Sequence, residues 1–464
     1  MQNNNMALVL LSFFCLIASS RAAISNKIGI NYGRLGNNLP SPSKSIELLQ
    51  SMNAGRVKLY DADHEILHLL SGKNIEVAIT VANDEISAIA SNQHLADQWV
   101  YEHVLAHYPS TKIRFVLVGN EVLSSTNTVQ DMQIARDLVP AMRRIKNTIK
   151  SQGIRNIKVG TPLAMDMMET TFPPSNGSFK PAIRELMIPL LKYLNGTKSF
   201  FFVDVYPYFA WAESRANNQT GIDLGFALLR SGNMTYTDPQ SGLVYTDLLD
   251  QMLDSVVYAM AKLGYDDVML AIAETGWPHD GDENEFGANR ENAAEYNNNL
   301  IKKMSAVPCN GTPARPGAVI PTFIFSMYDE NQKYGPATER HWGVMNPDGT
   351  AVYPVNMTGK GTNISTSTIV IVYKGKLRWV NQLPETAISS TLAIVVAPRN
   401  PPSHLCTRKD GDCKMARIQN PNRCRRKCVT ACITCGDGSP GEGPLNLKTT
   451  SGRSENQLVD GGLC

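Results

Sequence analysis

The chain has 464 residues, with 44 Lys and Arg against 42 Asp and Glu, which gives a formal net charge of +2. Hydrophobic residues make up 43% and charged residues 19%, as is ordinary for a globular protein with a large core. This balance argues against a disordered chain, a collagen-like fibre and a polyanion-binding protein, so we expect no nucleic-acid partner. Seven of the nine cysteines lie in the last 59 residues, so the chain has two compositional parts.

The N-terminus has the pattern of a cleaved secretory signal at residues 1–23. Residues 7–18 form an apolar run too short to cross a bilayer, and small residues precede the expected cleavage site. A buried N-terminal helix is the alternative. Removal of the signal takes away Cys15 and leaves eight cysteines, an even number suited to disulfides in an oxidising compartment.

Seven Asn-x-Ser/Thr sequons agree with export, and we treat their asparagines as candidate glycosylation sites. These are Asn176, Asn195, Asn218, Asn233, Asn310, Asn356 and Asn363. No later segment approaches the ~18 apolar residues of a transmembrane helix. We therefore expect a secreted protein with no transmembrane span.

Short runs rich in Val, Ile and Phe recur through the first 325 residues and suit parallel strands that are buried on both faces. The eight runs are 28–32, 57–60, 77–81, 115–118, 157–161, 200–205, 269–273 and 322–325. Between them lie stretches with apolar residues at three- and four-residue spacing, which predict helices. These include 43–52, 96–107, 131–151, 248–263 and 292–304. Eight strand–helix repeats predict an α/β fold, a (β/α)₈ TIM barrel, with a doubly wound open sheet as the main competitor.

The pattern predicts four parts: a signal peptide at 1–23, the barrel at 24–358, a linker at 359–403 and a small cysteine-rich basic tail at 404–464. The Gly-, Thr- and Asp-rich stretch 231–246 predicts a loop or hairpin on the barrel rim. The tail favours a disulfide-stapled segment over a zinc site, and its pairing cannot be read from sequence. Cys309 and Cys464 are a possible long-range pair. Three interpretations of the tail remain equal: it binds wall polymer, it is a solubilising appendage, or it results from the wrongful joining of two genes.

Polar side chains stand where the predicted strands end, which is where barrel active sites form. Glu121 follows the fourth strand and Glu274 follows the seventh, with aromatic residues around both. Cleavage of a glycosidic bond needs one carboxylic acid to protonate the leaving oxygen and one carboxylate to attack or to activate water. A loop salt bridge is the alternative use of such a glutamate.

Several motifs now make the chain recognisable: it resembles the plant endo-β-1,3-glucanases of glycoside hydrolase family 17. The matching stretches are GINYGRLGNNLP (29–40), VKLYDAD (57–63), VGNEV (118–122), DVYPYFAW (204–211), AETGWP (273–278) and DENQKYGPATERHWGVMNPDGTAVYPV (329–355). The resemblance implies a (β/α)₈ barrel that hydrolyses internal 1,3-β-D-glucosidic bonds with retention, without metal or cofactor. It also implies a β-glucan partner such as callose, cell-wall or fungal glucan, and a role in the cell wall or in plant defence.

By the same resemblance, Glu121 is the acid/base and Glu274 the nucleophile, with about 5–5.5 Å expected between their carboxyl groups. Asn120 is expected to bond the 2-hydroxyl of the reacting sugar, and Glu330 and Lys333 to orient nucleophile and substrate. Glu339 is a weaker candidate for contact. Tyr32, Tyr206, Phe209 and Trp277 are candidate cleft walls. His279 and Asp204 depart from the residues expected at their positions, which puts subsite preference in doubt.

Residues 64–68 read HEILH and match the H-E-x-x-H pattern of zinc proteases. No accompanying motif supplies a third ligand, so we predict a solvated helix face and no metal site. The sequence carries no dinucleotide fingerprint. Our hypothesis is a secreted, monomeric glucan endo-1,3-β-D-glucosidase. A mixed-linkage 1,3-1,4-β-glucanase and a non-catalytic cell-wall glucan-binding protein are the alternatives.

Overall fold

The computed structural model describes residues 27–359, apart from 125–126, 217–220, 231 and 233, together with five short strand segments between residues 370 and 448. The chain divides into two compact units, Met1–Gly361 and Thr362–Cys464. In the second unit, β16 (Val370–Tyr373) pairs antiparallel with β17 (Lys376–Trp379) and parallel with β18 (Val395–Val396). β19 (Cys432–Ile433) pairs antiparallel with β20 (Leu447–Lys448). The predicted signal peptide and most of the predicted linker and tail, Cys464 included, lie outside the described residues.

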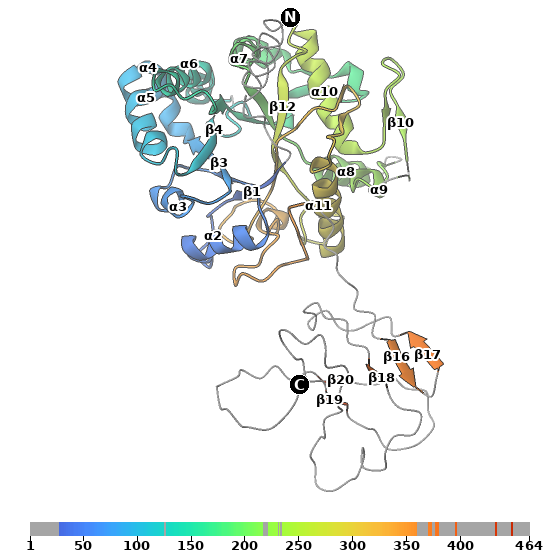
Figure 1. The fold of residues 1–464 in the computed structure, drawn as a ribbon. Coiled ribbons are helices and arrows are strands. Elements are labelled where there is room, and N and C mark those ends of the chain that lie inside the picture. The colour runs from blue at the N-terminus through green and yellow to red at the C-terminus, as the bar shows by residue number, and fades with distance from the viewer. Residues whose placement is uncertain are drawn as a thin grey trace, which may run out of the picture. The chain divides into compact units, whose positions relative to one another are not determined.

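The first unit is built around a parallel sheet with helices arranged outside it (Figure 1). Its strands are β1 (Ile28–Tyr32), β2 (Arg56–Leu59), β3 (Glu76–Val81), β4 (Lys112–Val118), β5 (Lys158–Gly160), β6 (Pro162–Ala164), β9 (Phe200–Asp204), β12 (Met269–Thr275) and β15 (Thr322–Ile324). They follow the order β5-β4-β3-β2-β1-β15-β12-β9-β6. The predicted TIM barrel is therefore confirmed, and the open-sheet alternative is wrong.

The fifth barrel strand is split in two. Where the sequence predicts one run at 157–161, the structure has β5 and β6 with only Thr161 between them. β5 pairs with β4 through three residues, and β6 pairs with β9 through three residues. The two halves thus hydrogen-bond to different neighbours, and the nine strands make an eight-position barrel that is nearly closed.

Most helices lie where the apolar spacing predicts them. The helices are α2 (Pro42–Ser51), α3 (His64–Leu69), α4 (Ile86–Ser91), α5 (Gln93–Val100), α6 (Val129–Ser151), α7 (Arg184–Thr197), α8 (Pro207–Ala216), α9 (Leu224–Ala227), α10 (Leu248–Lys262) and α11 (Arg290–Met304). The predicted helix 96–107 begins earlier, as α5, and continues into a π-helical turn at Tyr101–Leu105. α6 shows why these segments are helical: the hydroxyl of its N-cap Thr128 accepts from the Asp131 amide, and the Asp131 carboxylate accepts from the Thr128 amide.

Shorter elements decorate the barrel. They are β7 (Met168–Thr170), β8 (Ser178–Phe179), β10 (Tyr236–Thr237), β11 (Val244–Tyr245), β13 (Gly311–Thr312), β14 (Arg315–Pro316) and the 3₁₀ turns Asn83–Glu85, Met165–Met167, Pro174–Asn176, Pro181–Ile183 and Ala337–Arg340. β10 and β11 form an antiparallel hairpin, which confirms the hairpin alternative predicted for 231–246. Within the described part of the chain, no helix is both long and apolar enough to cross a membrane.

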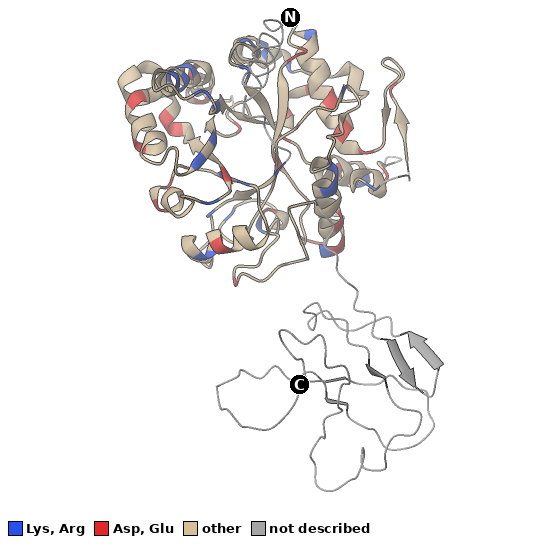
Figure 2. Ribbon diagram, in the orientation of Figure 1, with Lys and Arg blue, Asp and Glu red and all other residues tan. Residues whose placement is uncertain are grey.

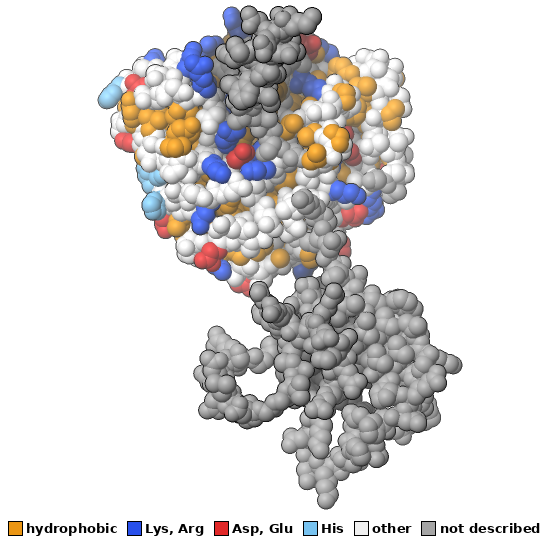
Figure 3. All heavy atoms as spheres, viewed as in Figure 1, with side chains coloured by type: hydrophobic (Ala, Val, Ile, Leu, Met, Phe, Trp, Pro, Cys, Tyr) orange, Lys and Arg blue, Asp and Glu red, His pale blue; other side chains and the backbone are white. Residues whose placement is uncertain are grey.

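Charged side chains are spread over the barrel unit without separation of sign. Figure 2 shows acidic and basic residues interspersed along the outer helices, and the face in Figure 3 mixes them with hydrophobic patches. This distribution offers no continuous basic surface on that face.

Two apolar layers hold the barrel together. Alternate strand residues face outward and join the helices in one large core. A second cluster contains strand residues alone and fills the barrel interior. Its members are Ala78, Phe115, Leu117, Phe200, Phe202, Ala271, Ala273 and Phe323. Phe115 makes edge-on contacts with three of these rings at centroid distances of 5.5–6.2 Å.

Replacing Phe115 by Ala should remove the central ring of this interior cluster. We expect the free energy of unfolding to fall by about 3–5 kcal/mol, because the barrel wall cannot collapse into the space left behind. Urea denaturation measures the change. Val129→Ala, at a side chain that is 91% exposed, is the control and should stay within about 0.5 kcal/mol of wild type. A loss below about 1 kcal/mol for Phe115→Ala would place this ring outside the interior.

Candidate active site

The sequence pattern placed Glu274 after the seventh barrel strand, but the structure places it inside that strand, β12. Ala271 and Ala273 face the barrel interior, so strict alternation would turn Glu274 outward. The register of β12 shifts at this point against both neighbours, β9 and β15. The hydroxyl of Thr275 instead bonds the phenol of Tyr296 on the outer helix α11, at 2.6 Å. A bulge of this kind re-aims one side chain, and here it directs the Glu274 carboxylate into the mouth of the barrel.

Three side chains, from β2 and from the segments that follow β2 and β9, hold the Glu274 carboxylate. The ammonium of Lys58 lies 2.7 Å from Oε1, and the hydroxyl of Tyr60 donates to the same oxygen at 2.6 Å. The hydroxyl of Tyr206 donates to Oε2 at 2.8 Å. Burial opposes ionisation, but the Lys58 charge and these hydrogen bonds outweigh it and hold the pKa of Glu274 below its ordinary value. Glu274 is therefore a buried carboxylate that stays ionised.

The two tyrosines act only as donors. Burial, followed by the nearby Glu274 charge, raises the pKa of both Tyr60 and Tyr206 well above the ordinary value of tyrosine. Lys58 is fully buried and its ammonium also lies 3.2 Å from Oδ1 of Asn120, the residue before Glu121. The lysine therefore connects β12, which contains Glu274, to the turn that carries Glu121.

Glu121 lies in a turn after β4, and hydrogen bonds hold the backbone of this turn in place. Gly119 and Glu121 both have positive φ, +70° and +52°, and a glutamate adopts this left-handed conformation only at a cost of about 1–3 kcal/mol. Its amide donates to the carbonyl of Pro162 in β6 at 3.1 Å. The side chain of Asn83 bonds both the amide and the carbonyl of Asn120. Neighbouring strands thus hold the strained turn in place.

The two glutamates have opposite electrostatic environments. Burial, followed by the Glu274 charge, raises the pKa of Glu121 to about 7. No cation lies as close to Glu121 as Lys58 lies to Glu274 among the ion pairs of the described residues. Near neutral pH the pair therefore contains one carboxylate and one carboxylic acid, the division of labour that glycosidic-bond cleavage requires.

Asp204 is a third carboxyl group beside this pair. It pairs in register with Glu274 across β9 and β12, and its side chain is 1% exposed. Neither of its carboxyl oxygens has a hydrogen-bond partner in the described structure. Burial, followed by the Glu274 charge, raises the pKa of Asp204 well above its ordinary value. This group is consequently a neutral acid, close in shape and charge to the asparagine expected at this position.

Glu330 and Lys333 lie in the segment after β15 and form a charged pair, as predicted. Oε1 of Glu330 accepts from the amide of Leu35 at 2.8 Å, while Nζ of Lys333 lies 3.7 Å from Oε2. Gly33 makes this approach possible, since a Cβ there would lie 2.3 Å from the Glu330 carboxylate. Lys333 also lies 3.8 Å from Glu339, which brings the weaker candidate into the same group.

The four predicted aromatic residues separate into two pairs. Tyr206 and Phe209 lie 5.5 Å apart between ring centroids, and Phe209 is 47% exposed, as a ring that stacks on a sugar must be. Trp277 is fully buried, and its Nε1 donates to the carbonyl of Gly287 at 2.8 Å. Tyr32 is also buried and packs edge-on against Tyr328. A ring without exposed surface cannot stack on a sugar, so the expected cleft-wall role does not fit Trp277 or Tyr32.

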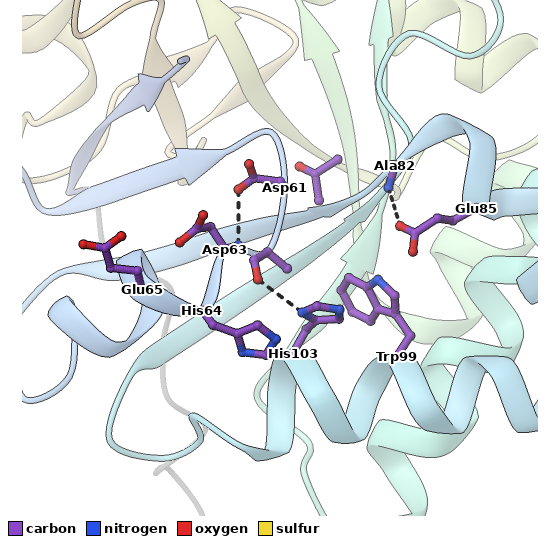
Figure 4. Close-up of a pocket in the computed structure, with 10 residues that line it drawn as sticks. Asp61, Asp63, His64, Glu65, Ala82, Glu85, Trp99 and His103 are labelled. Atoms are coloured by element: carbon purple, nitrogen blue, oxygen red, sulfur yellow. Dashed lines mark hydrogen bonds between the residues drawn. The ribbon is translucent and has the colours of Figure 1, made fainter. Parts of the chain in front are cut away.

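The first two residues of the H-E-x-x-H stretch, His64 and Glu65, line a pocket of about 520 Å³ near the ends of β2 and β3 (Figure 4). Nδ1 of His64 lies 3.0 Å from Nε2 of His107, and its ring stacks on His103 at 4.9 Å. Both partners lie outside the motif. The first histidine of the motif therefore belongs to a surface stack of imidazoles.

Four of the seven sequons fall within the described residues. Asn310 is exposed, while Asn176, Asn195 and Asn356 are half-buried. Asn195 lies within α7 and its side-chain oxygen accepts from Lys198 at 2.7 Å. Asn310 is thus the most accessible of the four, and occupancy of all seven stays a prediction.

Sequence reasoning missed the residues that set the charge of Glu274. Lys58 and Tyr60 both lie in the VKLYDAD stretch, and a lysine between the apolar residues of a buried strand is the signal that could have identified the first. Alternation then places Tyr60 on the same face of β2. The bulge in β12 has no comparable signal in the sequence.

Comparison with known proteins agrees with this geometry. Residues 28–357 match the family described as glycosyl hydrolases family 17. The chain belongs to this family. It is 55% identical over 386 residues to "Probable glucan endo-1,3-beta-glucosidase A6" of Arabidopsis thaliana, a match that covers 81% of this chain and 79% of that protein. "Glucan endo-1,3-beta-glucosidase 12" of Arabidopsis thaliana is 35% identical, and there the match covers 76% of this chain and 64% of the relative.

Solved structures extend the family assignment to the fold. The chain is similar to "CJP38, a beta-1,3-glucanase and allergen of Cryptomeria japonica pollen", with 38% identity, a TM-score of 0.66 and coverage of 72% of this chain and 99% of that one. It is also similar to a plant beta-glucan endohydrolase from a pair described as having distinct substrate specificities, with 32% identity, a TM-score of 0.63 and coverage of 71% and 99%. This family 17 glycosyl hydrolase therefore has the barrel of the plant β-glucanases.

Asp204→Asn should stabilise the protein at neutral pH but not at acidic pH. The pKa of Asp204 is higher in the folded than in the unfolded chain. As pH rises above about 4, the unfolded chain therefore loses this proton first, and the wild type loses stability. Asparagine carries no proton to lose. The difference in Tm between variant and wild type should increase from pH 4 to pH 7.5.

Asp84→Asn makes the same charge change on an exposed side chain and is the control. A Tm difference for Asp204→Asn that does not vary with pH, or that matches the control, would contradict a neutral Asp204.

Proposed function

We propose that this protein is a secreted, retaining endo-hydrolase of internal 1,3-β-D-glucosidic bonds in β-1,3-glucans. One observation carries the proposal: the pKa of Glu274 is held low while that of Glu121 is raised to about 7. A non-catalytic glucan-binding protein has no need of this opposite tuning. The names of the similar proteins, glucan endo-1,3-beta-glucosidases and a beta-1,3-glucanase, support the choice of bond.

In the first step, a carboxylate oxygen of Glu274 attacks the anomeric carbon of the sugar and forms a glycosyl ester. The bond from that carbon to the leaving oxygen breaks, and Glu121 gives its proton to that oxygen. The hydroxyls of Tyr60 and Tyr206 bond opposite oxygens of Glu274, so they fix the plane of the attacking group. Asn120 is held between Lys58 and the turn of Glu121, where we place the contact to the sugar 2-hydroxyl.

In the second step, the Glu121 carboxylate takes a proton from water, and the resulting hydroxide attacks the same carbon from the face that the leaving group vacated. The ester bond breaks and Glu274 departs as a carboxylate. Two inversions give net retention. The charge of Glu121 alternates through the cycle, which a pKa of about 7 allows near neutral pH.

The other expectations support export but rest on sequence. The signal pattern at 1–23, the sequons and the even number of remaining cysteines fit a secreted, disulfide-containing glycoprotein of the extracellular space or cell wall. We retain the β-glucan partner and the monomeric state as parts of the proposal. The linker at 359–403 and the tail at 404–464 also remain proposals.

Substitution of each glutamate should separate the two roles. Glu274→Ala and Glu121→Ala should each lower kcat on linear β-1,3-glucan by more than about 10²-fold, because one loses the covalent step and the other proton transfer. With an activated aryl glucoside oligomer, azide should restore turnover in both. The product should be the α-azide from Glu274→Ala and the β-azide from Glu121→Ala, as NMR of the anomeric proton shows.

Glu65→Gln, an exposed glutamate of the H-E-x-x-H stretch, is the matched control and should retain wild-type activity. Parallel assays on mixed-linkage β-glucan and cellulose decide the substrate class. Faster release from mixed-linkage glucan would favour the alternative glucanase. Binding to β-1,3-glucan without release of reducing ends would favour the binding protein.

The pH dependence should reflect the coupled pair. Below the lowered pKa of Glu274 the nucleophile is protonated, and above about pH 7 Glu121 loses its proton, so kcat/KM should be bell-shaped with its alkaline limb near pH 7.

Lys58→Met removes the charge that stabilises the Glu274 carboxylate. Its acid limb should therefore move to higher pH. An acid limb that stays in place would show that Lys58 does not set this pKa.

A further inference from the structure

Two histidines and one aspartate meet beside the catalytic strands without a part in the proposed reaction. His279 lies five residues after Glu274, in the segment that follows β12. Asp329 and His341 both lie in the segment that follows β15. The three side chains are 13%, 17% and 34% exposed, respectively, so the cluster is partly shielded but reachable from solvent.

The spacing of their donor atoms suits a small tetrahedral metal ion. Nε2 of His279 lies 3.0 Å from each carboxyl oxygen of Asp329, and Nδ1 of His341 lies 3.5 Å from Oδ2. All three ligand atoms lie within 4.8 Å of one another. Zinc–ligand distances of about 2.0–2.1 Å put the corners of a tetrahedron about 3.3–3.4 Å apart. The observed distances bracket this edge length.

Hydrogen bonding leaves one of these three ligand atoms, Nδ1 of His341, without a partner in the described residues. Nδ1 of His341 is buried, and its 3.5 Å separation from Asp329 is too long for a good hydrogen bond. Nδ1 of His341 and Oδ2 of Asp329 thus face each other at a distance at which a cation that replaces a proton between them would contact both atoms.

The surrounding backbone already fixes the ligands. The amide of Gly343 donates to Oδ1 of Asp329 at 2.8 Å, while Oδ2 faces both imidazoles. The amide of His279 donates to the carbonyl of His341 at 2.8 Å, so the two histidine segments are cross-linked before any ion binds. Such outer contacts orient metal ligands and reduce the entropy lost on binding.

We propose that His279, Asp329 and His341 bind one Zn²⁺ ion, with water at the fourth position. Two imidazoles and one carboxylate form a ligand set that zinc accepts, whereas Mg²⁺ and Ca²⁺ prefer oxygen ligands. The ion ties the segment after the nucleophile strand to the segment after β15, which begins the loop of Glu330 and Lys333. Its role is structural, because the site contributes none of the groups assigned to the two chemical steps. The proposal replaces the sequence-based prediction of no metal site, and it does not depend on the proposed glucanase activity.

The test compares zinc binding by full-length wild type, His279→Ser and Asp329→Asn after treatment with a chelator. We expect isothermal titration with ZnCl₂ to show one more equivalent of bound zinc in wild type than in His279→Ser. If His279→Ser still binds that equivalent, its affinity should be weaker than that of wild type by more than about 100-fold, which exceeds the change typical when a residue behind a metal ligand is replaced. Zinc bound by cysteines of the tail is common to all variants and cancels in the comparison.

His64→Asn is the matched control, because His64 also lies 3.0 Å from another imidazole but has no carboxylate in its stack. It should bind zinc like wild type. Zn²⁺ should also raise the Tm of wild type and of His64→Asn by the same amount, and should leave Asp329→Asn unchanged. Equal zinc equivalents in wild type and folded His279→Ser, or loss of the equivalent in His64→Asn alone, would overturn the proposal.

Discussion

The ion pair between Lys58 and Glu274 is the interaction on which the rest of the active site depends. Both side chains are buried, and an unpaired charge at such a depth costs several kcal/mol. The pair is tolerated because the hydroxyls of two tyrosines, just after β2 and just after β9, donate to the carboxylate oxygens. The resulting fixed negative charge then disfavours any other charge of the same sign nearby. Burial, followed by this charge, raises the pKa of both Glu121 and Asp204.

This arrangement explains how three carboxyl groups in one barrel mouth take different states. Among the described residues, the first has a cation at 2.7 Å, the second forms no ion pair, and the third has no hydrogen-bond partner. The position of each carboxyl group along the strands decides which of these environments it has. Lys58 lies on the inward face of β2, which directs its ammonium to the bulged strand β12. The chemistry assigned to each glutamate therefore follows from the geometry of the strands beneath it.

Much of the fold could be predicted from the sequence, because the eight barrel strands are buried on both faces and therefore read as apolar runs. The predicted strand boundaries were wrong where the backbone of a strand is irregular. The split at Thr161 leaves no mark in a run that remains apolar, and the bulge in β12 moved Glu274 from a predicted loop into the strand. Burial of the aromatics was equally hidden: Trp277 and Phe209 lie near strand ends in the sequence, yet one is in the core and the other is exposed. Periodicity reports local structure, whereas these features depend on contacts between distant segments.

The split of the fifth strand has a mechanical consequence. β5 is bonded to β4 on one side, β6 is bonded to β9 on the other, and each pairing involves only three residues. The amide of Glu121 is bonded to the carbonyl of Pro162, the first residue after the break. A shift of β6 at this seam would therefore move the backbone of Glu121 relative to β12, the strand that contains Glu274 and pairs with the other edge of β9. The least continuous part of the barrel wall is thus the part that holds the backbone of the proposed acid/base.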